Sequence, residues 1–89
     1  MLIALIARDK PGALQTRLDT RDAHVAYLKA TGVVSQAGPL LNDDGQMCGS
    51  LIVLDVPDMD TARRWAENDP YAHAGLFADV QLIEWNKVI

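Results

Sequence analysis

The chain has 89 residues, of which 49% are apolar and 22% are charged, and its formal net charge is −4. This length and composition predict one globular domain over residues 1–89 and exclude a disordered chain. The chain has twelve acidic and eight basic residues and no Lys/Arg run, which argues against binding to nucleic acid or to an anionic membrane surface. A small anionic ligand stays compatible, because a few local arginines can outweigh the net charge.

The single cysteine and the N-terminal residues indicate in which cellular compartment the protein is expected. Cys48 is the only cysteine, so no internal disulfide can form, and the chain suits a reducing environment. The apolar segment 1–7 is too short to span a bilayer and lacks the basic region of a signal peptide. We therefore expect a cytoplasmic protein.

The first part of the chain predicts a strand and a long helix. The strand covers residues 1–8 and stops at the turn sequence Asp9–Gly12. The helix covers residues 13–31, and Gly32 takes the position of a left-handed C-cap. The spacing of four apolar residues places them on one helix face, namely Leu14, Leu18, Val25 and Leu28.

A hairpin follows. Residues 33–41 have strand character that Gly38-Pro39 interrupts, and we expect this pair to bend the strand away from the sheet and to leave a crevice. The segment 42–45 (Asn-Asp-Asp-Gly) is typical of a hairpin turn, and a second long strand runs over residues 47–56.

The last part of the chain predicts a second helix and a final strand. Asp58 is a suitable N-cap for a helix that runs to residue 67, and the segment 68–70 (Asn-Asp-Pro) ends that helix. Residues 71–75 form one more short turn before the strand over residues 77–88.

The order β-α-β-β-α-β predicts an α+β, ferredoxin-like fold with a four-stranded antiparallel sheet and both helices on one face. The first strand carries Leu2, Ala4 and Ile6 on one face and Ile3, Leu5 and Ala7 on the other, so both faces are apolar. Large apolar patches rarely stay exposed. We therefore expect a homodimer that pairs the uncovered sheet faces, the alternative being a monomer with apolar central strands.

The strongest chemical candidate is His24 on the first helix. Arg17 and Arg21 lie on the same helix edge, seven and three residues earlier, and positive neighbours favour a neutral imidazole that can act as a base. The sequence has no phosphate-binding glycine loop, no His/Cys cluster with metal-ligand spacing and no nucleophile elbow. The alternative is a surface histidine packed beside a strand.

Asp69 is the candidate partner of this histidine. Pro70 restricts the backbone beside it, and the end of the second helix can approach the first helix in this fold. A carboxylate there would orient His24 and stabilise its protonated form. The alternatives are a plain turn aspartate, or His73 as the histidine of the pair, although we expect His73 to be solvated. Ser50, at the start of the third strand, could donate a hydrogen bond into a pocket or be a plain edge serine.

Several segments together carry a family resemblance. They are the helix segment Arg21–Leu28, the hairpin segments Gly38–Leu41, Asp44-Gly45 and Gly49–Leu51, and the segments Asp69–Tyr71 and Ala74–Phe77, with Asp9–Gly12 and Arg17 matching at the start. In this order they resemble the YCII-related (YciI-like) family over essentially the whole chain.

The resemblance implies a protomer of the dimeric α+β barrel group with a His–Asp active site, here His24 and Asp69. Ser50 carries over as a weaker pocket candidate, and Tyr71 belongs to the matching Asp-Pro-Tyr segment. Most of the family has no assigned reaction, but one branch removes chloride from a chlorinated hydroxyquinone without a metal or organic cofactor. Family membership does not by itself fix a substrate.

Two functions follow as hypotheses. The first is a small cofactor-free bacterial enzyme, a lyase or hydrolase without a metal, in which His24 transfers a proton and Asp69 orients it. Its substrate is a small anionic or aromatic molecule contacted by Arg17, Arg21, Ser50 and Tyr71. The second is a non-catalytic dimeric module that binds a small ligand or serves a larger enzyme.

Overall fold

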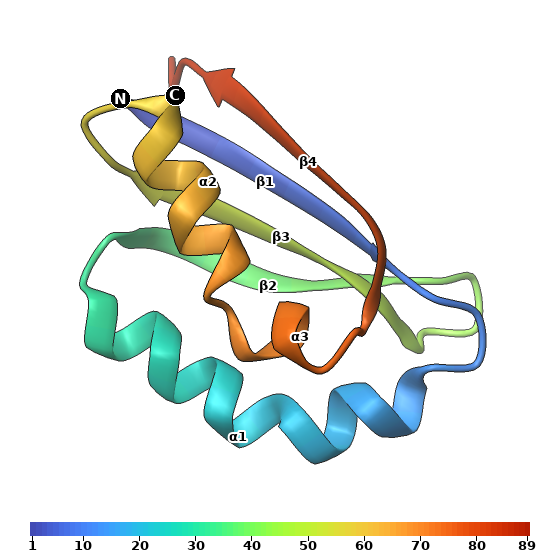
Figure 1. Cartoon of the computed structure of the whole chain (residues 1–89). Coiled ribbons are helices and arrows are strands. Elements are labelled where there is room, and N and C mark those ends of the chain that lie inside the picture. Colours follow the sequence, from blue (N-terminus) through green and yellow to red (C-terminus); the bar gives the residue numbers. More distant parts are fainter.

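The computed structural model describes residues 1–89, which form four strands and three helices (Figure 1). The strands are β1 (Leu2–Asp9), β2 (Val34–Leu41), β3 (Met47–Asp55) and β4 (Phe77–Trp85). The helices are α1 (Leu14–Thr31), α2 (Met59–Glu67) and α3 (Pro70–His73). The predicted element order is confirmed, with α3 in place of the short turn and with β4 ending earlier than expected.

The sheet has the order β2-β3-β1-β4, and every neighbouring pair is antiparallel. Leu5 lies at its centre, opposite Ile52 on one side and Leu82 on the other. Both long helices cover the same face (Figure 1), so the structure has the predicted ferredoxin-like α+β fold. No helix combines the length and the apolar character that a membrane crossing requires.

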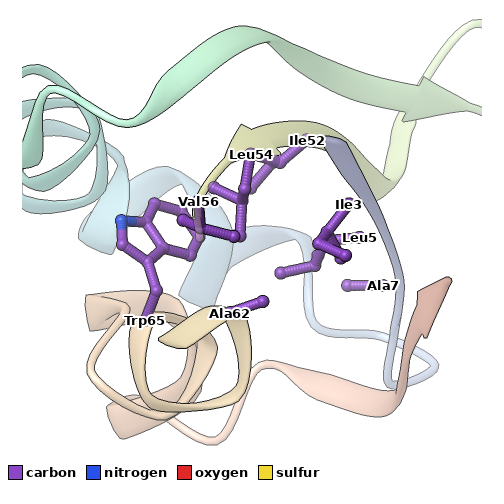
Figure 2. Packing of buried hydrophobic residues seen from close by; sticks show 8 residues of the cluster. All are labelled: Ile3, Leu5, Ala7, Ile52, Leu54, Val56, Ala62 and Trp65. Atoms are coloured by element: carbon purple, nitrogen blue, oxygen red, sulfur yellow. The ribbon is translucent and has the colours of Figure 1, made fainter. Parts of the chain in front are cut away.

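The core lies between this face of the sheet and α2. Side chains from β1 and β3 meet Trp65 of the helix in a cluster of eight buried residues (Figure 2), namely Ile3, Leu5, Ala7, Ile52, Leu54, Val56, Ala62 and Trp65. Two hydrogen bonds then join α1 to α2: Tyr27 donates to the Trp65 carbonyl at 2.8 Å, and Trp65 Nε1 donates to Thr31 at 2.9 Å. Burial of each large apolar side chain stabilises the fold by about 1.5–3 kcal/mol.

Helix α1 departs from its predicted apolar face at one position. Leu18 is 47% exposed, whereas the two buried residues of the helix are Arg17 and His24. The predicted face fails at Leu18 alone, since Leu28 packs against the core and Leu14 and Val25 are partly buried. The helix also covers a polar site, where both buried polar side chains have carboxylate partners. The periodicity of a helix indicates a face but not its chemistry.

The predicted interruption at Gly38-Pro39 is also wrong. Both residues stay paired with β3, opposite Leu51 and Ser50, and the shifts in register fall near the ends of β2 instead. An edge strand such as β2 tolerates proline better than a central strand, because only one of its sides takes part in the sheet. A cavity does lie beside this segment, although the strand does not bend away to form it.

Close packing between β1 and β3 explains the glycine before Ser50. A Cβ atom at Gly49 would collide with the carbonyl oxygen of Ala7 on the neighbouring strand. Gly49 thus permits the approach that directs the next residue, Ser50, toward the helices, where its side chain is 2% exposed.

Candidate functional site

The centre of the site is a buried contact between His24 and Asp69. His24 Nδ1 lies 2.8 Å from Asp69 Oδ1, and the two residues are 7% and 1% exposed. An ionised carboxylate only accepts hydrogen bonds, so Nδ1 carries the proton of the neutral imidazole and Nε2 carries the lone pair. The sequence-based pairing of these residues therefore corresponds to a direct contact, and His73 lies exposed outside it.

Local backbone structure holds Asp69 in place. It is the N-cap of α3, where Oδ1 also accepts the backbone N–H of Tyr71 at 2.9 Å. Its extended backbone is typical of a residue before proline, and Pro70 starts the helix. Asp69 Oδ2 is buried without a hydrogen-bond partner, so solvent screens the charge of this carboxylate poorly.

Tyr71 forms one wall of the site. Its ring stacks on the imidazole of His24, with centroids 3.8 Å apart and an angle of 15° between the planes. The Arg17 guanidinium carbon lies over the same phenol ring, 4.7 Å from its centroid. Burial raises the pKa of Tyr71, Arg17 lowers it and Asp69 raises it, and the net shift is upward. The phenol therefore stays neutral at physiological pH.

Arg17 is the other buried polar residue of α1. Its Nε and Nη2 donate to the two carboxylate oxygens of Asp9 at 2.7 and 2.8 Å, and Nη2 also donates to Ser50 Oγ at 2.9 Å. Burial alone would lower the pKa of Arg17, but the hydrogen bond and charge of Asp9, together with Tyr71, raise it above its ordinary value. Arg17 therefore carries its positive charge, and the carboxylate of Asp9 compensates that charge.

Sequence reasoning treated Asp9 only as part of a turn and missed this role. The available signal was an acidic residue that closes a strand shortly before a helix with an inward-facing arginine. Such a pair is worth testing wherever a buried arginine is expected, since an unpaired buried charge is costly.

These residues surround a cavity of about 170 Å³ between α1, α3 and the hairpin. Its lining comprises Arg17, Arg21, His24, Val25, Leu28, Ala37, Gly38, Pro39, Met47, Ser50, Ile52 and Tyr71. Arg21 is exposed and makes no ion pair, so it is the cation of this lining that no carboxylate neutralises. All the predicted site residues except Asp69 reach the cavity, and Asp69 lies behind His24.

The cavity therefore brings together a nitrogen lone pair, a hydroxyl group and a free positive charge, from His24, Ser50 and Arg21. This set can transfer a proton, hold an oxygen atom and attract an anion. No group of three His, Cys, Asp or Glu side chains is placed to hold a metal ion.

The fold and the site define a small ferredoxin-like domain with a buried His–Asp contact beside a cavity. The model of the YCII-related domain matches residues 1–86, and the chain belongs to this family. Protein YciI of Escherichia coli O6:H1 is 34% identical over 97 residues, covering 99% of each chain. An uncharacterised protein of Haemophilus influenzae is 33% identical, with the same coverage.

Solved structures agree with this assignment. The 5-chloro-2-hydroxyhydroquinone dehydrochlorinase of Burkholderia phenoliruptrix, in complex with 2,5-dihydroxybenzoquinone, is 36% identical with a TM-score of 0.88. The match covers 97% of this chain and 94% of that one. An antibiotic biosynthesis monooxygenase, 11% identical with a TM-score of 0.58 over 98% of this chain and 100% of its own, shares the fold alone.

Proposed function

We propose that this protein is a small enzyme that catalyses an elimination by general acid–base chemistry, with His24 as the proton-transfer group. The observation that carries the proposal is the buried 2.8 Å contact between His24 Nδ1 and Asp69 Oδ1 beside a cavity. Asp69 keeps the proton on Nδ1, which leaves Nε2 as the base. Asp69 acts through His24 and is a positioning residue.

In the proposed step, Nε2 takes a proton from the substrate. The electron pair of the broken bond to hydrogen moves into a new double bond, and the leaving group departs with the electrons of its own bond. The imidazolium later releases its proton to water. Likeness to a dehydrochlorinase over nearly the whole chain supports elimination, with chloride as one leaving group. The step uses no metal and no organic cofactor.

The charges of the cavity favour an acidic substrate. Arg17 is engaged by Asp9 and Ser50, so steering of an anion belongs to Arg21 alone. Arg21 lies one helical turn from His24, close enough for one small molecule to contact both side chains. The proposed substrate is therefore a small ring or carbonyl compound with an anionic or readily ionised oxygen.

The proposal is tested with 5-chloro-2-hydroxyhydroquinone, using chloride release as the readout. His24→Gln should lower kcat by about 10²–10⁴, the usual contribution of a positioned acid–base group. His73→Gln is the matched control, because His73 is exposed and outside the cavity, and it should keep the wild-type rate.

Two outcomes would contradict the proposal. An unchanged rate in a folded His24→Gln variant would remove His24 from the mechanism. A wild-type protein that binds 2,5-dihydroxybenzoquinone without releasing chloride from the chlorinated compound would instead favour the non-catalytic binding module.

A further inference from the structure

The hydroxyl group of Ser50 has a defined orientation. Its Oγ accepts a hydrogen bond from Arg17 Nη2 at 2.9 Å, and the side chain is nearly fully buried at the cavity wall. A guanidinium group cannot accept a hydrogen bond, so the Ser50 proton must point elsewhere. No protein group accepts it, and the open direction for this donor is the cavity.

Arg17 is held too firmly to release Ser50. Both carboxylate oxygens of Asp9 bind the guanidinium group, and Asp9 and Arg17 are themselves almost fully buried. A hydroxyl group that accepts a hydrogen bond from a cation becomes a better donor, because hydrogen bonds in a chain polarise one another. Asp9 and Arg17 thus prepare Ser50 to donate a strong hydrogen bond.

We propose that Ser50 donates this hydrogen bond to a carbonyl or enolate oxygen of the substrate, so that the substrate class is small carbonyl compounds with an acidic C–H or O–H group. The inference rests on the proposed function and extends it. When His24 removes a proton conjugated with the carbonyl group, electron density moves onto the carbonyl oxygen. The Ser50 hydrogen bond strengthens at that moment, while its proton stays on Ser50.

The size of the cavity restricts this class further. A cavity of about 150 Å³ accommodates benzene, so about 170 Å³ holds one six-membered ring with few substituents. Ser50 reaches the ring from β3, whereas His24 and Arg21 reach it from α1. Asp9 lies outside the cavity lining and acts as a positioning residue through Arg17, and Arg17, which lines the cavity, holds the Ser50 hydroxyl group in place.

The inference is tested by calorimetric binding of two probes that share one ring. 2,5-Dihydroxybenzoquinone has carbonyl oxygens, whereas hydroquinone has only hydroxyl groups. Ser50→Ala should weaken binding of the quinone about tenfold or more, the usual effect of losing a charge-assisted hydrogen bond, and should hardly change binding of hydroquinone. Ser50→Thr keeps a hydroxyl group and should retain most of the preference. Ser35→Ala, on the exposed edge strand β2, is the matched control.

A measurement on the unmodified protein complements the variants. The carbonyl stretching band of the bound quinone should move to lower wavenumber in the wild-type protein and back toward its position in water in Ser50→Ala. An unmoved band in the wild type, or equal losses of affinity for both probes in Ser50→Ala, would overturn the inference.

His24→Gln separates this inference from the proposed function. It should abolish most chloride release while leaving the carbonyl band shifted. A normal rate in His24→Gln with a shifted band would contradict the acid–base role only. A slow His24→Gln variant combined with an unshifted band would contradict the carbonyl contact only.

Discussion

The buried polar residues of α1 each depend on one carboxylate from a different part of the chain. Arg17 is paired with Asp9 at the end of β1, and His24 contacts Asp69 at the start of α3. Transfer of a charged group from water into a protein costs several kcal/mol unless a partner compensates it. The two contacts therefore explain how a helix can present an arginine and a histidine to the sheet where apolar residues are usual.

The raised pKa of Tyr71 predicts how the stability of the protein depends on pH. Burial and the Asp69 charge raise the pKa of Tyr71 above its ordinary value of 10.0 despite the opposing effect of Arg17. Above pH 10 the unfolded chain therefore loses this proton before the folded chain does. The free energy of unfolding should fall as the pH rises from about 10 through the folded pKa.

Urea unfolding between pH 8 and 11 tests this expectation. The loss of stability on going to alkaline pH should be smaller in Tyr71→Phe than in the wild type. Tyr27 provides a comparison, because burial and then Asp69 raise its pKa in the same direction. Parallel pH profiles for the wild type and Tyr71→Phe would show that the phenol titrates alike in both states.

Among the elements, α2 shows how a cap defines the start of a helix. Asp58 Oδ1 accepts hydrogen bonds from the backbone N–H and the hydroxyl group of Thr61, both at 2.7 Å. These bonds, with Arg64 adding a smaller contribution, lower the pKa of Asp58 against the weaker opposing effect of burial. The stabilisation by the charged cap is present above the ordinary pKa of 3.8 and is lost as the pH falls through the folded value.

We expect Asp58→Ala to lower Tm at neutral pH by roughly 4–8 °C, as for the loss of an N-cap in a domain of this size. Asp58→Asn keeps an acceptor that does not titrate. It should therefore lose less stability than the wild type between pH 5 and 2. Thermal unfolding of the three proteins across this range checks both statements, and a steeper acid transition in Asp58→Asn would contradict the second.

In the whole molecule, one face of the sheet is not covered by helices. The middle of this face is uncharged and mostly apolar, and three of its apolar side chains are 40–45% exposed, namely Leu51, Ile83 and Trp85. The segment Ala37–Pro39 lines both the cavity and a groove on this face. A second copy of the chain, related by a two-fold axis, is our proposed occupant, since such an interface pairs one patch with itself.

Two positions on β4 test the homodimer with matched exposure. Ile83 is 45% exposed on the uncovered face, and Val80 is 43% exposed on the opposite face of the same strand. Ile83→Lys should raise the dimer dissociation constant by about 10² or more, because it buries an unpaired charge in each protomer. Val80→Lys should leave it unchanged. Sedimentation velocity gives the answer, and a monomeric wild-type protein would contradict the proposal.

Sequence alone determined the order of the elements and several of their ends, because these depend on neighbouring residues, although β4 ends at Trp85 and not at residue 88. The alternation in β1, the Asp58 cap and the left-handed Gly32 after α1 are local features, and the structure has all three. The residues able to carry chemistry were also evident, since His24, Asp69, Ser50 and Tyr71 stand in segments that a family shares.

Only the tertiary structure decided which of these groups touch. His24 and Asp69 are 45 positions apart, and Arg17 and Ser50 are 33 apart, so their contacts depend on how helices and strands pack. The pairing of Arg17 with Asp9 then left Arg21 as the free cation, a distinction that a shared position on one helix edge could not make. The sequence also could not show that Arg17, and not its neighbour Leu18, is the buried residue at this point of the helix. Helical periodicity fixes the direction in which each side chain leaves the helix. The side chains that it contacts there come from distant parts of the chain.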